Sequence, residues 1–276
     1  MEPPARADAC EAAGLRGCRG RLARRGSDRG GEPRRHGPPR SGGERLCLRH
    51  AAAAADKQTF APPRDDQWIY TEDKLTSSDG RAPTIIARWH LADGRGSAFI
   101  DDHGALQVDT IPQHHPNRPP PGLFDSYEAL AALPTDPAAL LHVAYGQTKN
   151  ISGAGSTDDA EVFSMFRVIL GQGVLPPGLE SAVFRVLEQV PGVTAKTSAV
   201  NGRPALAVGQ TDDWLNQELL LDMNTYLYLG QRSTVVKDAV INPLKAGKST
   251  GQVKKGHWVV AERVATGVID KPGEKP

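Results

Sequence analysis

A helix-rich block at residues 134–193 separates two strand-rich stretches and constrains the fold more than any other feature of this sequence. Its first segment opens at Asp136-Pro137, a helix N-cap followed by proline at the first helical position, and is expected to end at Gly146. A second segment opens at Ser156 or Thr157, and a third ends at Pro191-Gly192. Strands, an insert of helices and further strands predict an α+β protein whose helices cover one sheet.

The second and third helical segments are predicted to form an antiparallel hairpin with one apolar side. Apolar residues of the second, from Val162 to Leu170, recur at i, i+3, i+4 and i+7. The third runs from Pro176 to Val190, and the linker GQGVLPP joins the two. Phe166 and Phe184 are expected to face each other or the sheet, because the apolar side needs a sheet to cover it.

Nine strands are predicted around this insert. Those before it are spaced by about ten residues with turn signals between them, which indicates an antiparallel meander. Asn201-Gly202 is the strongest hairpin signal of the chain and lies between two of the later strands. The predicted strands are 68–75, 83–90, 97–100, 105–111, 193–198, 204–211, 214–221, 226–236 and 257–268. A brief helix is expected at 126–133 after Asp125, a polar loop at 237–256, and a frayed end at 271–276.

Composition divides the chain near residue 50. Residues 1–50 hold twelve arginines and all three cysteines but no Phe, Trp, Tyr, Ile or Val, so they are expected to be disordered. Such a composition also results from out-of-frame translation of GC-rich DNA, in which case the true N-terminus differs. Residues 51–66 are predicted to be a short helix and linker, and 67–270 a single α+β domain. No aromatic residue lies among these arginines for base stacking, so a nucleic-acid partner is not expected.

Metal and cofactor sites are not expected. The predicted folded part lacks cysteine, which argues against a disulfide framework or a zinc cluster there. Asp101-Asp102-His103 form an ordinary turn sequence, and His114-His115 lie in a proline-rich loop. No nucleophile or phosphate-loop motif is present, so the sequence predicts a non-enzymatic protein, with an Asp/His-dependent hydrolase as a remaining alternative.

Four segments together resemble an actinobacterial family of uncharacterised proteins encoded beside extracytoplasmic-function sigma factors. They are DDQWIYTEDK, LPTDPAALL, VLPPGLESAVFRVLEQVPGV and ELLLDMNTYLYLGQRSTVV, and the resemblance spans residues 51–270. It implies an extracytoplasmic domain anchored by one transmembrane helix, working as a monomer with an envelope or sigma-pathway protein as partner. Residues 1–50 contain no apolar stretch of the ~20 residues that such a helix needs.

The order of strands and helices, with the hairpin LLLDMNTYLYLGQRS, is more remotely similar to the half-barrels of LolA and of RseB-type sensors. That resemblance implies a curved antiparallel sheet around an apolar cavity that takes acyl chains. We expect the four tryptophans to pack in the core, and the alternative is that they line an apolar pocket. The cleft is expected to be lined by Trp68, Trp89, Leu219 and Leu221, with Leu141 and Val183 opposite.

Three classes of function follow from these observations. The first is a non-enzymatic envelope domain that binds an apolar ligand, a lipid or a partner protein. The second is a structural or interaction domain with a filled core, and the third is the hydrolase. A large pocket lined by tryptophan favours the first, a packed interior the second, and carboxylates converging on histidine the third.

Overall fold

The computed structural model describes residues 42–58, 61–111, 126–148, 157–241 and 251–276. The helices are α1 (Gly42–Ala55), α2 (Tyr127–Ala131), α3 (Pro137–Thr148), α4 (Asp158–Gly171) and α5 (Leu179–Leu187). The strands are β1 (Trp68–Ser77), β2 (Thr84–Leu91), β3 (Gly96–Ile100), β4 (Leu106–Thr110), β5 (Thr194–Val200), β6 (Arg203–Thr211), β7 (Leu215–Asp222), β8 (Tyr228–Val235), β9 (Ala239–Ile241), β10 (Gly251–Val253) and β11 (Trp258–Ile269).

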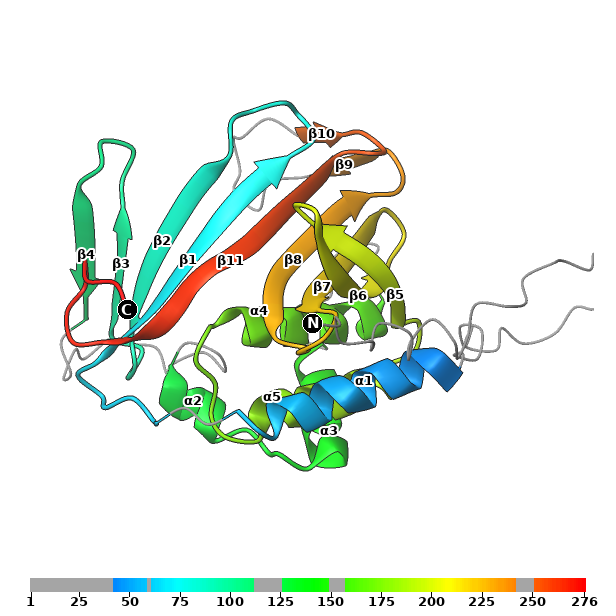
Figure 1. The fold of residues 1–276 in the computed structure, drawn as a ribbon, viewed down its shortest axis with the longest axis horizontal. Helices are drawn as coiled ribbons and strands as arrows, with labels where there is room; N and C mark the ends of the chain where they lie inside the picture. Colours follow the sequence, from blue (N-terminus) through cyan, green and yellow to red (C-terminus); the bar gives the residue numbers. More distant parts are fainter. Residues whose placement is uncertain (1–41, 59–60, 112–125, 149–156, 242–250) are drawn as a thin grey trace, which may run out of the picture.

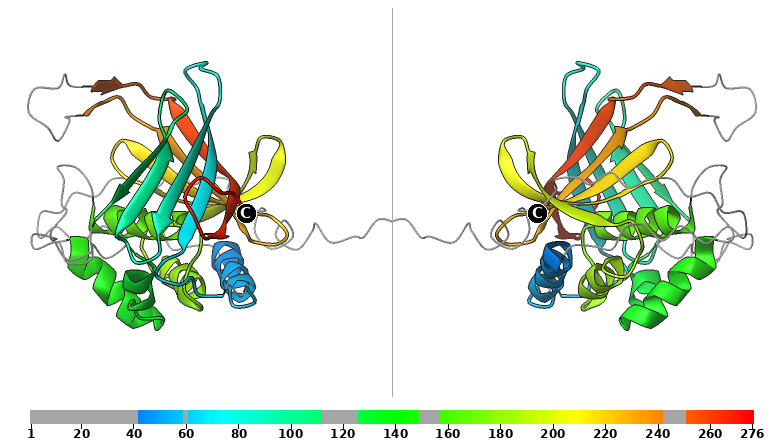
Figure 2. Two further views of the ribbon diagram at one scale, coloured as in Figure 1. Left: turned by 90° about the vertical axis from the view of Figure 1, so that its left-hand side faces the viewer. Right: turned by 90° about the vertical axis from the view of Figure 1, so that its right-hand side faces the viewer.

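Nine strands form one antiparallel sheet in the order β4-β3-β2-β1-β11-β8-β7-β6-β5 (Figure 1). The sheet curves without closing, so β4 and β5 remain its two edges, and the helices gather along one side of the strands (Figure 2). Each predicted strand matches a strand of this sheet to within two residues at either end. The fold class predicted from the sequence, an α+β half-barrel with about nine strands, is confirmed.

The last strand of the chain, β11, lies in the middle of the sheet. It pairs with β1 on one side, where Trp68 lies opposite Ile269, and with β8 on the other. In Figure 1 it therefore joins the meander of β1–β4 to the two hairpins of β5–β8. An ion pair of 2.8 Å between Arg263 Nε and Asp73 Oδ1 links β11 to β1.

Two glycine-containing positions set the course of the strands. Asn201 and Gly202 have φ angles of 47° and 81°, the two positive values that a tight I′ hairpin turn requires, and so confirm the predicted turn. Gly230 has φ 140°, and a Cβ built there would lie 2.1 Å from the carbonyl oxygen of Ala261. Only glycine therefore allows β8 to approach β11 at this point.

The helices form a layer in which α4 and α5 have different neighbours. Helix α4 contacts α3 and the strands β6, β7 and β8, whereas α5 packs mainly against α1 and α3. Helices α4 and α5, predicted to form a hairpin, do contact each other, but most of the contact of α5 is with α1, which the sequence did not indicate as a neighbour. Phe166 and Phe184 both have 0% exposure and belong to the same core cluster.

Helix α1 is part of the folded domain. Leu48 and Ala51 are each 1% exposed, and Cys47 lies in the same core, so the expectation of a folded part without cysteine is wrong. Surface ion pairs of Arg49 with Glu188 and of Asp56 with Arg185 also connect α1 to α5 and its C-terminal end. The expected boundary at residue 50 falls inside this helix, and residues 1–41 lie outside the described part of the chain.

Three smaller expectations also change. Helix α3 continues through Gly146, where it was expected to end, to Thr148. The N-cap of α2 is Ser126, whose hydroxyl accepts a hydrogen bond of 3.0 Å from Ala129 N, while Asp125 lies outside the described residues. The polar segment before β11 contains the paired strands β9 and β10.

The two faces of the sheet carry separate cores, because alternate residues of a strand point to opposite sides. The helix face carries Leu206, Val208, Leu219 and Leu221, packed with the apolar side of the helices. The opposite face carries two small clusters. One consists of Trp68, Tyr70, Trp89, Ala98 and Ile269, and the other of Val200, Ala205, Ala207, Leu220 and Leu229.

Candidate functional site

The six residues predicted to line a cleft do not meet in one site. Val183, Leu219 and Leu221 lie together with 0% exposure in the core between helices and sheet, and Leu141 packs at its edge. Trp68 and Trp89 belong to a different cluster. Register places that cluster on the face opposite the helices, so the tryptophans and the leucines are separated by the sheet itself.

The C-terminal tail, residues 270–276, covers these tryptophans. The indole Nε1 of Trp89 donates a hydrogen bond of 2.8 Å to the carbonyl oxygen of Glu274. Lys275 Nζ lies 2.6 Å from the carboxylate of Glu72 and 5.9 Å from the ring centre of Tyr70. The prediction of a frayed end is therefore wrong, and the chain's own residues cover the part of this face around Trp89 and Tyr70.

A large cavity lies on this same face but further along the sheet. We call it the trough; its volume is about 580 Å³. It spans five strands because the β5–β6 hairpin bends over toward β11, where Asn201 Nδ2 donates a hydrogen bond to the carboxylate of Glu262. Its lining residues are Thr76, Lys196, Ala199, Val200, Asn201, Asn216, Glu218, Arg232, Thr234, Val236, Trp258 and Val260.

One tryptophan and three valines give the trough its apolar walls. Trp258 is 37% exposed, and Val260 follows two residues later on the same face of β11. Val200 and Val236 come from the hairpin and from the end of β8. Trp258 is thus the tryptophan that lines a pocket, although the sequence favoured Trp68 and Trp89 for that role.

An ion-pair network forms the floor of the trough. The carboxylate of Glu218 is 2% exposed and lies 2.5 Å from Arg232 Nε and 2.8 Å from Lys196 Nζ. Arg232 Nη2 also donates a 2.9 Å hydrogen bond to Ser198 Oγ, which ties β8 to β5. Two cations against one anion leave a net positive charge on the floor. No sequence motif marks these residues, because their pairing depends on four neighbouring strands.

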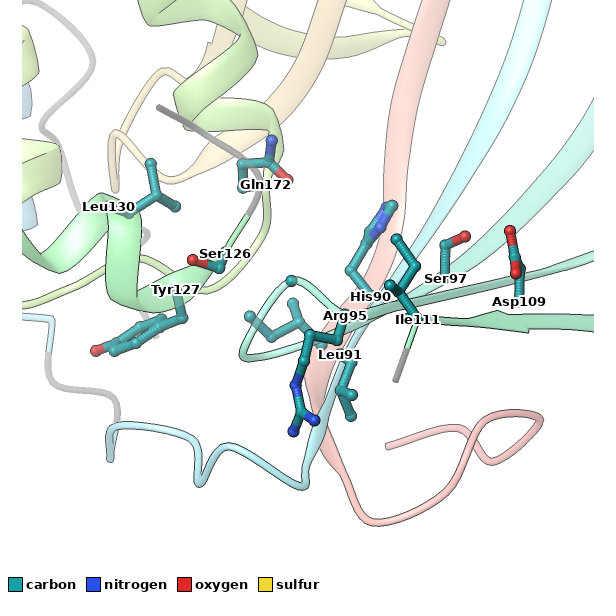
Figure 3. Close-up of a pocket in the computed structure, with 13 residues that line it drawn as sticks. His90, Leu91, Arg95, Ser97, Asp109, Ile111, Ser126, Tyr127, Leu130 and Gln172 are labelled. Atoms are coloured by element: carbon teal, nitrogen blue, oxygen red, sulfur yellow. The ribbon is translucent and has the colours of Figure 1, made fainter. Parts of the chain in front are cut away.

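A second pocket, of about 280 Å³, is bounded by the β2–β4 strands and α2 (Figure 3). Register places His90, Ser97 and Asp109 side by side on β2, β3 and β4. The serine is the middle residue, and Figure 3 shows Asp109 on the far side of Ser97 from His90. A serine–histidine–aspartate relay needs the histidine in the middle, so this row does not form one.

The electrostatics of the same row also differ from those of a relay, in which the aspartate raises the pKa of the histidine. Burial, and secondarily the charge of Arg88, lowers the pKa of His90, which keeps the imidazole neutral. At the other predicted set, Asp101 accepts backbone hydrogen bonds of 2.9 Å from both His103 and Ala105 and so stabilises a turn. No group of three or more potential ligands that could hold a metal ion is found in the described ranges, and His114-His115 lie outside them.

Among the solved structures that match this chain are the following two. A protein domain assigned to outer membrane lipoprotein sorting, from Vibrio parahaemolyticus, aligns with 83% of this chain and 93% of its own at 10% identity and a TM-score of 0.23. A DUF1329 family protein from Desulfovibrio piger aligns with 83% and 94% at 8% identity and a TM-score of 0.24. No protein-family model and no curated protein matches the chain.

Proposed function

We propose that this domain binds a ligand with an apolar body, of which an acyl chain is the simplest case, in the trough, and catalyses no reaction. The observation that carries the proposal is a cavity of about 580 Å³ with Trp258 in its wall. Ligand pockets commonly have volumes of about 300–1,000 Å³, apolar walls and a few fixed polar groups. The trough has these properties, and the net charge of its floor favours an anionic head group over a neutral one.

The expected affinity follows from the length of the chain. Each buried methylene contributes about 0.8 kcal/mol, so the fourteen of hexadecanoate contribute about 11 kcal/mol. Lost translation and rotation cost at least about 4 kcal/mol. The remaining ~7 kcal/mol corresponds to a dissociation constant of about 10 μM.

Calorimetric titration of the intact domain with hexadecanoate tests the proposal. Trp258→Ala removes a wall, and Thr234→Trp fills the trough without removing a core side chain, so each should weaken binding at least tenfold. Trp214→Ala is the matched control, because Trp214 does not belong to the lining. A neutral monoacylglycerol of the same chain length should bind less tightly. Absence of heat with the intact domain, or unchanged binding by both trough variants, would refute the proposal.

The second candidate function is binding of a partner protein at the edge of the sheet, and one observation favours it. All five residues of the edge strand β4 are exposed, including Leu106 at 38% and Val108 at 49%. An unpaired edge with apolar side chains accepts an added strand from another protein. Cross-linking in an envelope extract should then yield a species that Val108→Lys removes and Asp102→Lys, a substitution in the preceding turn, preserves.

We also propose an extracytoplasmic location with a membrane anchor, and a monomer that acts in a sigma-factor-linked pathway. These proposals rest on the resemblance of residues 51–270 to the family encoded beside such sigma factors. No helix within the described residues has the length and apolarity to cross a membrane. Protease protection of the domain in intact cells tests its location: resistance that is lost after envelope permeabilisation supports it, and cleavage only after cell lysis contradicts it.

A further inference from the structure

A third cavity lies between the helices and the sheet, on the side of the sheet away from the trough. Its volume is about 240 Å³, equal to that of about eight water molecules in the liquid. We call it the helix-side cavity. It is lined by Ala55, Gln58, Leu170, Gly173, Leu175, Pro176, Pro177, Gly178, Glu180, Leu227, Tyr228, Arg263 and Thr266.

The walls of the helix-side cavity are mostly apolar. Leu170 at the end of α4 is 3% exposed, and Leu175 in the connection to α5 is 8% exposed. Pro176 continues this wall, and Leu227 closes it from the start of β8. A small aliphatic chain would therefore contact carbon on most sides.

Arg263, one of the charged groups in the cavity, already has its partners. Its Nε lies 2.8 Å from the carboxylate of Asp73, and its Nη2 donates a 2.7 Å hydrogen bond to the carbonyl oxygen of Gly171. The guanidinium also lies 5.2 Å from the ring centre of Tyr228. Because Asp73 balances its charge, Arg263 does not itself demand an anion.

Glu180 differs from Arg263 because nothing in the described part of the chain donates a hydrogen bond to it or pairs with its charge. It projects from the first turn of α5 into the cavity, where burial raises its pKa to about 7. The hydroxyl of Tyr228 likewise has no hydrogen-bond partner within the described ranges. A carboxylate and a phenol thus face one apolar cavity from two layers of the fold, and both can accept a hydrogen bond.

We propose that the helix-side cavity is a second ligand site, which takes a small alkylammonium ion. Its nitrogen binds the carboxylate of Glu180 and donates a hydrogen bond to the hydroxyl of Tyr228, and its chain lies against Leu170 and Leu175. Glu180 is half-buried, so its carboxylate loses part of its hydration, and an ammonium group replaces that hydration with both a charge and hydrogen-bond donors. Neither an anion nor a neutral alcohol supplies the missing charge.

Other charged groups around Glu180 do not replace such a ligand. Asp56, directly after α1, pairs with Arg185 of α5 at 2.6 Å, which leaves no net charge there. Arg167 of α4 acts on Tyr228 but does not line the cavity. Burial raises the pKa of Tyr228 to about 12, so its hydroxyl remains neutral at physiological pH.

The site predicts a pH dependence with a definite sign. Cation binding requires ionised Glu180, and in the empty cavity that group is half protonated near pH 7. Affinity should therefore rise with pH, and the ionised fractions at pH 8 and pH 5.5 differ by about thirtyfold for a pKa near 7. Binding near pH 6 should also release a proton to the buffer.

Calorimetric titration with n-pentylammonium at pH 8 and pH 5.5 provides the test, with pentanoate and pentanol as ligands of equal length. Glu180→Gln should abolish ammonium binding and its pH dependence without unfolding the domain, since it removes a buried charge. Tyr228→Phe should weaken it by a smaller factor. Glu188→Gln is the control, because Glu188 forms a surface pair with Arg49.

The absence of pentylammonium binding at pH 8 would overturn the proposal, and so would equal binding by the Glu180→Gln variant. Pentanol binding as tightly as the ammonium ion would also overturn it, by showing that the cavity selects for carbon alone. The trough variant Thr234→Trp should leave ammonium binding unchanged. This measurement distinguishes ligand binding in the helix-side cavity from the ligand binding proposed for the trough.

Discussion

Deleting residues 271–276 should destabilise the domain, although the sequence of this segment predicts a frayed end. The deletion removes the acceptor of the 2.8 Å hydrogen bond from the indole of Trp89 and the lysine that pairs with Glu72. It also uncovers the aromatic cluster beneath, where Tyr70 has 0% and Trp89 1% exposure. The physical question is how much of that cluster becomes exposed to water.

The magnitude is dominated by burial. Exposure of about 100 Å² of aromatic surface costs about 2.5 kcal/mol at 25 cal/mol per Å². The pair of Lys275 with Glu72 adds at most about 1 kcal/mol, because the lysine is largely exposed. The indole loses its carbonyl acceptor but gains water, so that change adds little. The free energy of unfolding should fall by about 2–4 kcal/mol.

Urea unfolding followed by far-UV circular dichroism and tryptophan fluorescence measures this change. The truncated domain should unfold at a lower urea concentration, and the fluorescence emission of its native state should shift to longer wavelength as Trp89 becomes exposed to water. Lys275→Ala is the control: it removes the ion pair with Glu72 and the contact with the Tyr70 ring but leaves the tail in place, and it should change stability by less than about 1 kcal/mol. An unchanged midpoint and unchanged emission after truncation would show that the tail does not pack on the cluster.

Three further substitutions test the packing and charge of the fold. Phe184→Ala should lower the free energy of unfolding by about 3–5 kcal/mol because the ring is fully buried, while Val168→Ala, at a site 44% exposed, should cost less than about 1 kcal/mol in the same urea assay. Burial opposes ionisation of Asp222, but the amides of the following turn and a neighbouring guanidinium lower its pKa to about 2. The carboxylate thus stabilises the fold above its unfolded pKa of about 3.9 and loses that effect toward pH 2, so Asp222→Asn should be less stable than wild type at pH 6 and equal to it at pH 2. Gly230→Ala should cost more than about 1 kcal/mol, because the new methyl group meets a carbonyl oxygen of β11, and an unchanged urea midpoint would refute that contact.

The elements that sequence predicted well are those specified by neighbouring residues. Turn signals spaced by about ten residues identified the strands, and Asn201-Gly202 located a hairpin because few residues adopt positive φ angles. Thr157 capped α4 as predicted, since its hydroxyl accepts a hydrogen bond from Ala160 N. In each case the controlling interaction spans only a few residues.

The features that sequence missed depend on residues far apart in the chain. The packing of α1 against α5 brings together residues more than 120 positions apart, as the pair of Asp56 with Arg185 shows. Docking of the tail likewise joins Trp89 to Glu274 across 185 positions. The helix pattern of residues 158–190 showed that an apolar side existed, but any apolar surface could have covered it.

The error over the tryptophans shows what a binding site requires beyond strand prediction. Each tryptophan points to one face of its strand, and Trp68 and Trp258 both lie on the face of this sheet opposite the helices. The two tryptophans differ in their position along the sheet. The C-terminal tail covers the cluster that contains Trp68, whereas the β5–β6 hairpin bends over β11 and leaves a space beside Trp258. That hairpin reaches β11 only because β11 inserts between β1 and β8. The order of strands in the sheet, rather than the identity of the aromatic residue, therefore decides which tryptophan lines a cavity.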